Sequence, residues 1–258
     1  MAVASFESGA VPNARTVTLC CMGWLCVTWS IYLLNGLSDL TGDRSNGSTR
    51  PLAQGTLNSN YARRLVIILA ATGLGLCLLA GERIFALGTV MITLGFFYSA
   101  GPSPLKNSVC GVQVSVVGGG LVTYAAGASA VGSGPTPAAT VFAAALSAWM
   151  AVGGLSKDLS DVEGDRTAGR FTLAMWSERG TYAVITAAAA TVAASFVVAA
   201  QSVAVGLIVS AMFLCVGAVS IAVCAVARTI LRWHARTPYH AFMYSQYGAH
   251  AGALCLVL

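Results

Sequence analysis

The stretch L-S-D-L-T-G-D-R-S-N-G, residues 37–47, recurs as L-S-D-V-E-G-D-R-T-A-G at residues 159–169. Leu, Ser, Asp, Gly, Asp, Arg and Gly stand at the same seven places in both copies, at a constant offset of 122 residues. The whole chain has only nine acidic residues, so two matching acidic copies indicate a real internal repeat. We therefore expect two related halves, each with an acidic element of the same function.

The composition is that of a membrane protein. The chain is 57% hydrophobic and 9% charged, whereas a soluble domain carries roughly 25% charge. Its apolar stretches run for about 17–25 residues, the length of helix that crosses a bilayer. Because these stretches are continuous and do not alternate with polar residues, they disfavour a β-barrel. The sequence predicts an all-α, polytopic transmembrane helical bundle.

We expect about eight membrane spans in a single domain that covers residues 1–258. The spans are predicted near residues 16–36, 62–80, 84–99, 107–131, 137–156, 181–200, 203–226 and 241–258. Residues 1–15 are expected to be a polar leader, and residues 37–61 and 157–180 are expected to be polar loops. The repeat predicts two four-helix pseudo-repeats, with motif copies at 35–47 and 157–169.

The charges predict the orientation in the membrane. Four spans separate the two acidic copies, so both copies emerge on the same face. The basic residues predicted on that face are Arg44, Arg50, Arg63, Arg64, Lys106, Lys157, Arg166, Arg170, Arg179, Arg228, Arg232 and Arg236. Only Arg15 and Arg83 fall on the other face, and the positive-inside rule makes the acidic face cytoplasmic. The net charge of +5 thus reflects topology, and no nucleic-acid partner is expected.

Each copy carries a column of oxygen-bearing side chains at helical spacing. The columns are Asn35, Asp39 and Asp43 at i, i+4 and i+8, and Asp158, Asp161 and Asp165 at i, i+3 and i+7. Clustered carboxylates repel each other, so they need a compensating cation. Oxygen-only ligands favour Mg²⁺, which usually takes its remaining ligands from water and phosphate. The columns predict metal ligands at Asp39, Asp43, Asp158, Asp161 and Asp165 around a diphosphate.

The alternative is that both copies are solvated turns, as Gly42, Gly47, Gly164 and Gly169 allow. Asn35 and Asp158 extend each polar face toward the membrane, which a simple turn does not require. For this reason the metal-site interpretation is preferred. The three His and eight Cys show no spacing typical of metal ligands, and they are assigned no role.

A second polar element, Y-S-A-G-P-S-P-L-K, covers residues 98–106 on the same face. Lys106 can pair with phosphate oxygens as a point charge, and Tyr98 can donate a hydrogen bond. Interfacial Tyr and Lys residues are also common in any membrane protein, which is the alternative. Further candidates for the diphosphate, or for charges that only set the topology, are Arg44, Arg50, Arg166 and Arg170.

These elements resemble the motifs of one family. The segment N-G-L-S-D-L-T-G-D (35–43) resembles the NxxxDxxxD motif of the UbiA superfamily of intramembrane prenyltransferases, and K-D-L-S-D-V-E-G-D (157–165) resembles its DxxDxxxD motif. Residues 98–106 resemble the Tyr/Lys element between the two. The order and spacing of the motifs match over residues 16–258. The resemblance implies a helical bundle that binds a polyprenyl diphosphate through Mg²⁺ and transfers the prenyl group to a lipophilic, often aromatic, acceptor.

The resemblance also implies residue roles. The Asp residues of the two columns would bind Mg²⁺, and Asp161 is a candidate proton acceptor. Lys106 and Tyr98 would act in catalysis by stabilising the departing diphosphate. The residues expected to bind substrate are Asn35, Arg44, Arg50, Lys106 and Arg166.

The sequence departs from the family pattern in two places. Family members usually have nine spans, and their first motif ends the second span, whereas here it ends the first. Either a span lies upstream of this sequence, or the protein works with eight. In addition, Ala174 stands where the family often has Pro.

Two other functions remain open at this point. A terpene cyclase on the same scaffold would use the same Asp motifs with the prenyl diphosphate alone and would need no acceptor. A secondary transporter is suggested by the G-D-R-S-N-G and G-D-R-T-A-G loops, but that class does not require Asn35, Asp39 or Asp158. The sequence leaves the prenyl chain length and the acceptor undecided.

Overall fold

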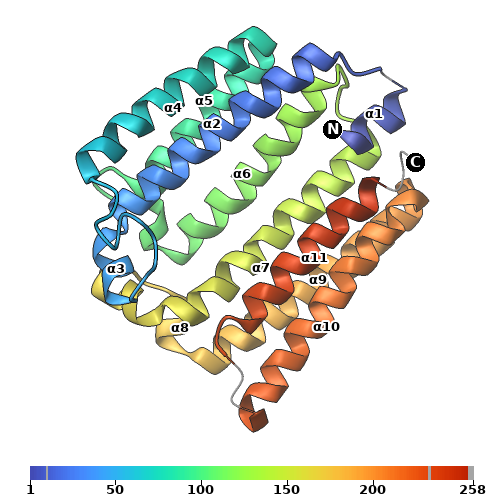
Figure 1. Ribbon diagram of the computed structural model, residues 1–258. Helices are drawn as coiled ribbons and strands as arrows, with labels where there is room; N and C mark the ends of the chain where they lie inside the picture. The colour runs from blue at the N-terminus through green and yellow to red at the C-terminus, as the bar shows by residue number, and fades with distance from the viewer. Residues whose placement is uncertain (10, 232–233, 255–258) are drawn as a thin grey trace. The chain divides into compact units, whose positions relative to one another are not determined.

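The computed structural model describes residues 1–9, 11–231 and 234–254, and all regular structure in these residues is helical. Arg232, Cys255 and the end of the last predicted span lie outside them. The helices are α1 (Ala2–Ser8), α2 (Ala14–Ser38), α3 (Leu40–Ser45), α4 (Ser59–Ala80), α5 (Glu82–Ser99), the 3₁₀ turn η1 (Leu105–Asn107), α6 (Val109–Ala130), α7 (Pro137–Thr167), α8 (Leu173–Trp176), α9 (Glu178–Val203), the 3₁₀ turn η2 (Val205–Leu207), α10 (Ile208–Leu231) and α11 (Thr237–Leu254) (Figure 1). The predicted all-α class is confirmed.

Six of the described helical segments are long and apolar enough to cross a membrane, so the chain is an integral membrane protein by length and composition. They are Ala14–Ser38, Ser59–Ala80, Val109–Ala130, Pro137–Thr167, Glu178–Val203 and Val205–Arg228. The predicted count of about eight is therefore not confirmed. Helices α5 and α11 each have 18 residues, but α5 opens with two charged residues and α11 carries several polar ones, which lowers their hydropathy.

The prediction of an unpatterned leader over residues 1–15 is wrong. Residues Ala2–Ser8 form helix α1, and the side chains of Val3 and Ala4 are buried. The carboxylate of Glu7 accepts a hydrogen bond of 3.0 Å from the backbone N–H of Ala138, in the first turn of α7. An acid at this place satisfies an N–H group that has no partner within its own helix.

The chain divides into two compact units. The first comprises Met1–Ala10, Ser133–Ser160 and Leu173–Leu258, and the second comprises Val11–Gly132 and Asp161–Thr172. The second unit thus contains the first motif copy together with most of the second copy. The division into two four-helix pseudo-repeats stays a prediction.

In the second unit, α2 packs closely on α4 and α5 through glycines. A Cβ atom on Gly73 of α4 would lie 2.9 Å from the backbone nitrogen of Val27 in α2. A Cβ atom on Gly95 of α5 would lie 2.5 Å from the side chain of Ile31. In lipid, helices associate through such close backbone approach because apolar burial drives them little. These contacts fix the end of α2, where the first motif begins.

The first unit is organised around Trp149 of α7, which is fully buried. Its indole N–H donates to the carbonyl oxygen of Phe242 in α11 at 3.4 Å. Gly217 of α10 faces Trp149 so closely that a Cβ atom there would lie 2.8 Å from the indole ring. On α9 and α10, Arg228 pairs with Glu178 and lies over the ring of Tyr182, 5.1 Å from its centroid.

Substitution of Gly73 by Ala should destabilise the protein, because the new methyl group would meet the backbone of α2. Overpacking of this kind costs about 1–3 kcal/mol. The measurement is the apparent midpoint of thermal denaturation in detergent, which should fall for Gly73→Ala. Gly75→Ala is a matched control on the same helix, since no atom lies within 4 Å of its Cβ position. Equal midpoints for the two variants would contradict the packing of α2 on α4.

Candidate functional site

Both motif copies end a helix with the same turn. Gly47 and Gly169 have positive φ angles of 62° and 69°, which glycine adopts without strain. The N–H group that follows each glycine donates back to the carbonyl of the last aspartate of its copy, Asp43 or Asp165, at 2.9 Å in both cases. This is the Schellman arrangement that terminates helices. The repeated D-R-x-x-G pattern therefore specifies two equivalent helix ends, each with an aspartate in its last turn.

The first polar column spans a helix break. Helix α2 ends at Ser38, and Asp39 has φ −95° and ψ 3° before α3 begins. The backbone N–H of Asp39 still donates to the carbonyl of Asn35 at 2.9 Å, and that of Asp43 donates to Asp39 at 2.8 Å. The column thus keeps its helical spacing across the break.

The second column lies on a continuous helix. Residues 157–180 were expected to be a polar loop, but α7 runs without interruption to Thr167 and α8 follows at Leu173. That expectation is wrong because the motif residues complete the last turns of the helix. Asp161 and Asp165 lie in the second unit, whereas Asp158 belongs to the first.

The two copies contact each other through their shared glycines. A Cβ atom on Gly42 would lie 3.0 Å from the carbonyl oxygen of Gly164. A Cβ atom on Gly164 would lie 2.1 Å from the side-chain nitrogen of Asn46. The glycines recur in the sequence at the points where the two acidic segments meet, and this contact brings their carboxylates together.

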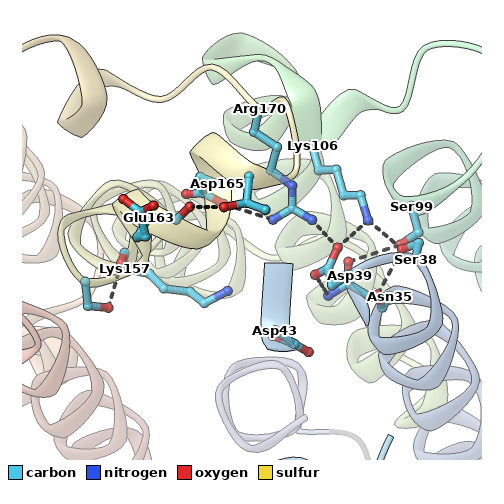
Figure 2. A network of polar contacts seen from close by, with 12 residues as sticks. Asn35, Ser38, Asp39, Asp43, Ser99, Lys106, Lys157, Glu163, Asp165 and Arg170 are labelled. Atoms are coloured by element: carbon cyan, nitrogen blue, oxygen red, sulfur yellow. Dashed lines mark hydrogen bonds and ion pairs between the residues drawn. The ribbon is translucent and has the colours of Figure 1, made fainter. Parts of the chain in front are cut away.

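The carboxylate of Asp39 is the centre of the polar network in Figure 2. It is buried, with 6% of its surface exposed. Its Oδ1 atom accepts from the ammonium group of Lys106 at 2.5 Å and from the guanidinium group of Arg170. Its Oδ2 atom accepts from the amide of Asn35 at 3.0 Å. One acid from the first motif thus joins the end of α2, the η1 turn and the segment after α7.

Lys106 is held in place by the backbone of η1. Its ammonium group also donates to the hydroxyl of Ser38 at 2.5 Å. The turn packs so tightly on α6 that a Cβ atom on Gly111 would lie 2.1 Å from the carbonyl oxygen of Leu105. Burial lowers the pKa of Lys106 below the usual value for lysine, although the hydrogen bond and the charge of Asp39 oppose this effect.

Arg170 connects the two motifs. Its Nη2 atom pairs with Asp39, and its Nη1 atom pairs with Asp165 at 3.2 Å. Burial by itself would lower the pKa of this guanidinium, but the carboxylates of Asp39 and Asp165 outweigh it and raise the pKa, with a smaller contribution from Tyr98.

The other predicted arginines make local contacts. Arg50 binds both carboxylate oxygens of Asp43, at 2.9 and 3.1 Å. Arg44 donates to the carbonyl of Ala53 at 3.3 Å and so holds the loop after α3. Arg166 pairs with Glu163 at the surface, at 3.1 Å.

Sequence reasoning missed two serines in the network. Ser38 accepts from Lys106, and Ser99 donates from its hydroxyl to the amide oxygen of Asn35 at 3.4 Å. The repeat offered an indication for Ser38, since the serine recurs as Ser160 in the second copy. Ser99 lies in the 98–106 element, in which only Tyr98 and Lys106 were assigned a role.

Two carboxylates of the site have oxygen donors that suit a hard cation, and both point toward the same positive group. Asp39 and Asp165 come from different motifs and converge on one positive group, the guanidinium of Arg170. Oxygen donors of this kind are those that Mg²⁺ prefers. Within the described residues, no three His, Cys, Asp or Glu side chains lie close enough together to hold a metal ion as they stand.

The comparisons with a family model and with solved structures agree on one family. The model of the UbiA prenyltransferase family matches residues 1–246. The apo structure of a UbiA homologue from Aeropyrum pernix K1 superposes with a TM-score of 0.76 at 18% identity, covering 100% of this chain and 95% of that chain. A UbiA homologue from Archaeoglobus fulgidus bound to GPP and Mg²⁺ gives 0.67 at 19% identity, with 99% and 93% covered.

Two curated relatives carry the same name. The digeranylgeranylglyceryl phosphate synthase of Sulfolobus acidocaldarius is 29% identical over 157 residues, which cover 59% of this chain and 54% of the relative. That of Methanopyrus kandleri is 29% identical over 175 residues, which cover 67% and 59%. The match thus spans somewhat more than half the length of these relatives.

The burial of Lys106 can be tested by chemical labelling. The chain has two lysines, Lys106 and Lys157, and the Lys106 side chain is only 5% exposed. Gly111→Ala should displace η1 and increase acylation of Lys106 by an amine reagent severalfold, measured by peptide mass spectrometry relative to Lys157. Gly118→Ala is the control, because its Cβ position is 3.6 Å from the nearest atom, an ordinary contact. Unchanged labelling in Gly111→Ala would show that η1 does not depend on this glycine.

Proposed function

The chain belongs to the UbiA prenyltransferase family, and on this premise we propose that it is a Mg²⁺-dependent intramembrane prenyltransferase. It moves a prenyl group from a prenyl diphosphate to a lipophilic acceptor and releases diphosphate. The observation that carries the proposal is the convergence of Asp39 and Asp165, one acid from each motif, on a single cation beside Lys106. The same pair of acids can share a divalent ion with a diphosphate.

Departure of diphosphate concentrates negative charge on its oxygens, and fixed cations stabilise that charge. Lys106 provides a buried ammonium group for one of these oxygens. Tyr98 and the amide of Asn35 are the proposed hydrogen-bond donors. The residues that would hold Mg²⁺ are Asp39, Asp43, Asp158, Asp161 and Asp165. When bound, Mg²⁺ neutralises the diphosphate and makes it a better leaving group.

The remaining site residues have supporting roles in this proposal. Asp161 is partly buried at the start of the segment that carries Asp165, and it is the candidate acceptor for the proton that the acceptor substrate loses. Arg44 and Arg50 shape the loop after α3, and Arg166 provides positive charge at the surface. These surface charges attract an anionic substrate to the membrane interface. We place this face of the protein in the cytoplasm by the positive-inside rule.

The acceptor is proposed from the two curated relatives. Their name, digeranylgeranylglyceryl phosphate synthase, describes a glyceryl phosphate that bears two geranylgeranyl groups. We propose that the present protein likewise takes geranylgeranyl diphosphate and a geranylgeranyl-bearing glyceryl phosphate. An aromatic acceptor is the alternative that the experiment below separates.

The direct test uses purified protein in detergent with geranyl, farnesyl or geranylgeranyl diphosphate, with and without Mg²⁺. Each donor is offered alone, with geranylgeranylglyceryl phosphate, or with an aromatic quinone precursor, and the extracts are analysed by mass spectrometry. A product that needs Mg²⁺ and contains both donor and acceptor supports the proposal. A cyclic product formed from the donor alone would identify a terpene cyclase and overturn it.

Asp39→Asn should reduce turnover by roughly 100-fold or more, because it removes the charge at the centre of the site, and groups of this kind contribute about 10²–10³ in kcat. The measurement is product formation at saturating Mg²⁺. Glu163→Gln is the control in the other copy, since that side chain is 70% exposed and pairs with Arg166 at the surface. Near-normal turnover in Asp39→Asn would contradict the proposed site.

The fall in activity at alkaline pH should reflect the loss of the proton from Lys106. Because burial lowers the pKa of this lysine below its usual value of 10.5, its positive charge is lost at a lower pH than that of an exposed lysine. We expect kcat/KM for the prenyl diphosphate to fall as the pH rises through this lowered pKa. Lys106→Arg keeps its charge and should move the fall to higher pH. An identical alkaline limb in both proteins would exclude Lys106 as the titrating group.

A further inference from the structure

An arginine follows each motif copy, Arg50 after the first and Arg170 after the second. The two differ in burial and in that Arg170 also reaches the other motif. Arg50 binds the last aspartate of the first copy, Asp43, and its side chain is 50% exposed. Arg170 binds the last aspartate of the second copy, Asp165, and its side chain is only 15% exposed. In addition, Arg170 reaches Asp39 in the first copy (Figure 2).

The contact of Arg170 with Asp39 uses Oδ1, the carboxylate oxygen that a metal ion would use. A carboxylate oxygen has two lone pairs, and both lone pairs of Asp39 Oδ1 are used by Lys106 and Arg170. The other oxygen accepts from Asn35. A divalent ion can bind Oδ1 only if one of the two cations leaves.

The structure indicates which cation can leave. Lys106 is tied to both Asp39 and Ser38, and its turn is fixed by the packing of η1 on α6. Arg170 has a second carboxylate, Asp165, in its own turn, so it can give up Asp39 and remain paired. Two cations on one oxygen also repel each other, and Arg170 is among the groups that lower the pKa of Lys106.

We propose that Arg170 occupies the cation position at Asp39 in the substrate-free protein and moves to the prenyl diphosphate when it arrives, leaving Asp39 to the metal. The inference rests on the proposed function. A guanidinium group binds phosphate oxygens with two parallel hydrogen bonds, so the diphosphate replaces the contact that Arg170 gives up at Asp39. Metal and diphosphate then bind with positive coupling, and each tightens the other by the same factor.

The test measures binding without turnover. Binding of Mn²⁺ is followed by electron paramagnetic resonance, with and without a geranyl thiolodiphosphate analogue, after correction for Mn²⁺ bound by the analogue in solution. In wild-type protein the analogue should tighten Mn²⁺ binding. In Arg170→Gln, Mn²⁺ alone should bind about tenfold tighter or more, since one neighbouring cation shifts a carboxylate by about 1–3 pKa units. The coupling between analogue and metal should fall toward one.

Two further variants keep the result interpretable. Arg63→Gln removes the same charge elsewhere in the second unit, at an exposed side chain of α4 that donates to Asn60, so Mn²⁺ affinity and coupling should match wild type. Arg170→Lys keeps the charge and cannot bridge two carboxylates with a planar fork. It should bind Mn²⁺ more tightly than wild type and with reduced coupling, and it decides the question if Arg170→Gln does not fold.

Unchanged or weaker Mn²⁺ binding in Arg170→Gln, or in Arg170→Lys where the former fails to fold, would overturn the inference. So would full coupling in a folded Arg170 variant. Failure of the proposed function is a separate outcome, because the wild-type protein would then form no Mg²⁺-dependent product that contains both donor and acceptor. An active wild-type enzyme whose Arg170 variants bind Mn²⁺ as wild type does would retain the function and lose only the role of Arg170.

Discussion

The arrangement of the site depends on the buried carboxylate of Asp39 and on the three groups that share it. Lys106 comes from the η1 turn, Arg170 from the segment after α7, and Asn35 from the end of α2. Removal of one partner from a buried ion pair typically costs about 3–5 kcal/mol, because the remaining charge is left without compensation. The network therefore holds these segments together as well as presenting charge. Under the proposed function, the same electrostatics favours ligands that bring their own charges, since a metal and a diphosphate together would replace the contacts that each would break.

The backbone brings these charges together through glycines. Gly42 and Gly164 allow the two acidic segments to touch, and Gly111 allows η1 to lie on the first turn of α6. Gly47 and Gly169 turn the chain at equivalent helix ends. Larger residues at the first three positions would separate elements that must lie within hydrogen-bonding distance. The polar chemistry of the site is thus set by close backbone approach, the same device that packs α2 on α4 in the membrane-spanning part.

The two motif copies end their helices in the same way, but the arginines that follow them make different contacts. Each copy places an aspartate in the last turn of its helix. An arginine that follows the copy folds back on this aspartate, Arg50 on Asp43 and Arg170 on Asp165. Only Arg170 continues to the other motif. The first copy thus provides the shared acid at Asp39, and the segment that follows the second copy provides a cation bound to it.

The sequence by itself determined the helical class, the membrane location, the family and the two acidic motifs, because apolar length, charge content and a repeated spacing are local properties. It also singled out Asp39 and Lys106, which the structure places in one polar network. It was wrong about the leader, where α1 buries Val3 and Ala4, and about the loop after residue 157, where α7 continues to the turn that the Arg170 N–H group closes on Asp165. Only the tertiary structure decided that Lys106 and Arg170 share one oxygen of Asp39, and that Arg44, Arg50 and Arg166 bind locally. The two contacts with Asp39 depend on distances between segments more than 60 residues apart in the chain, and residue spacing carries no information about them.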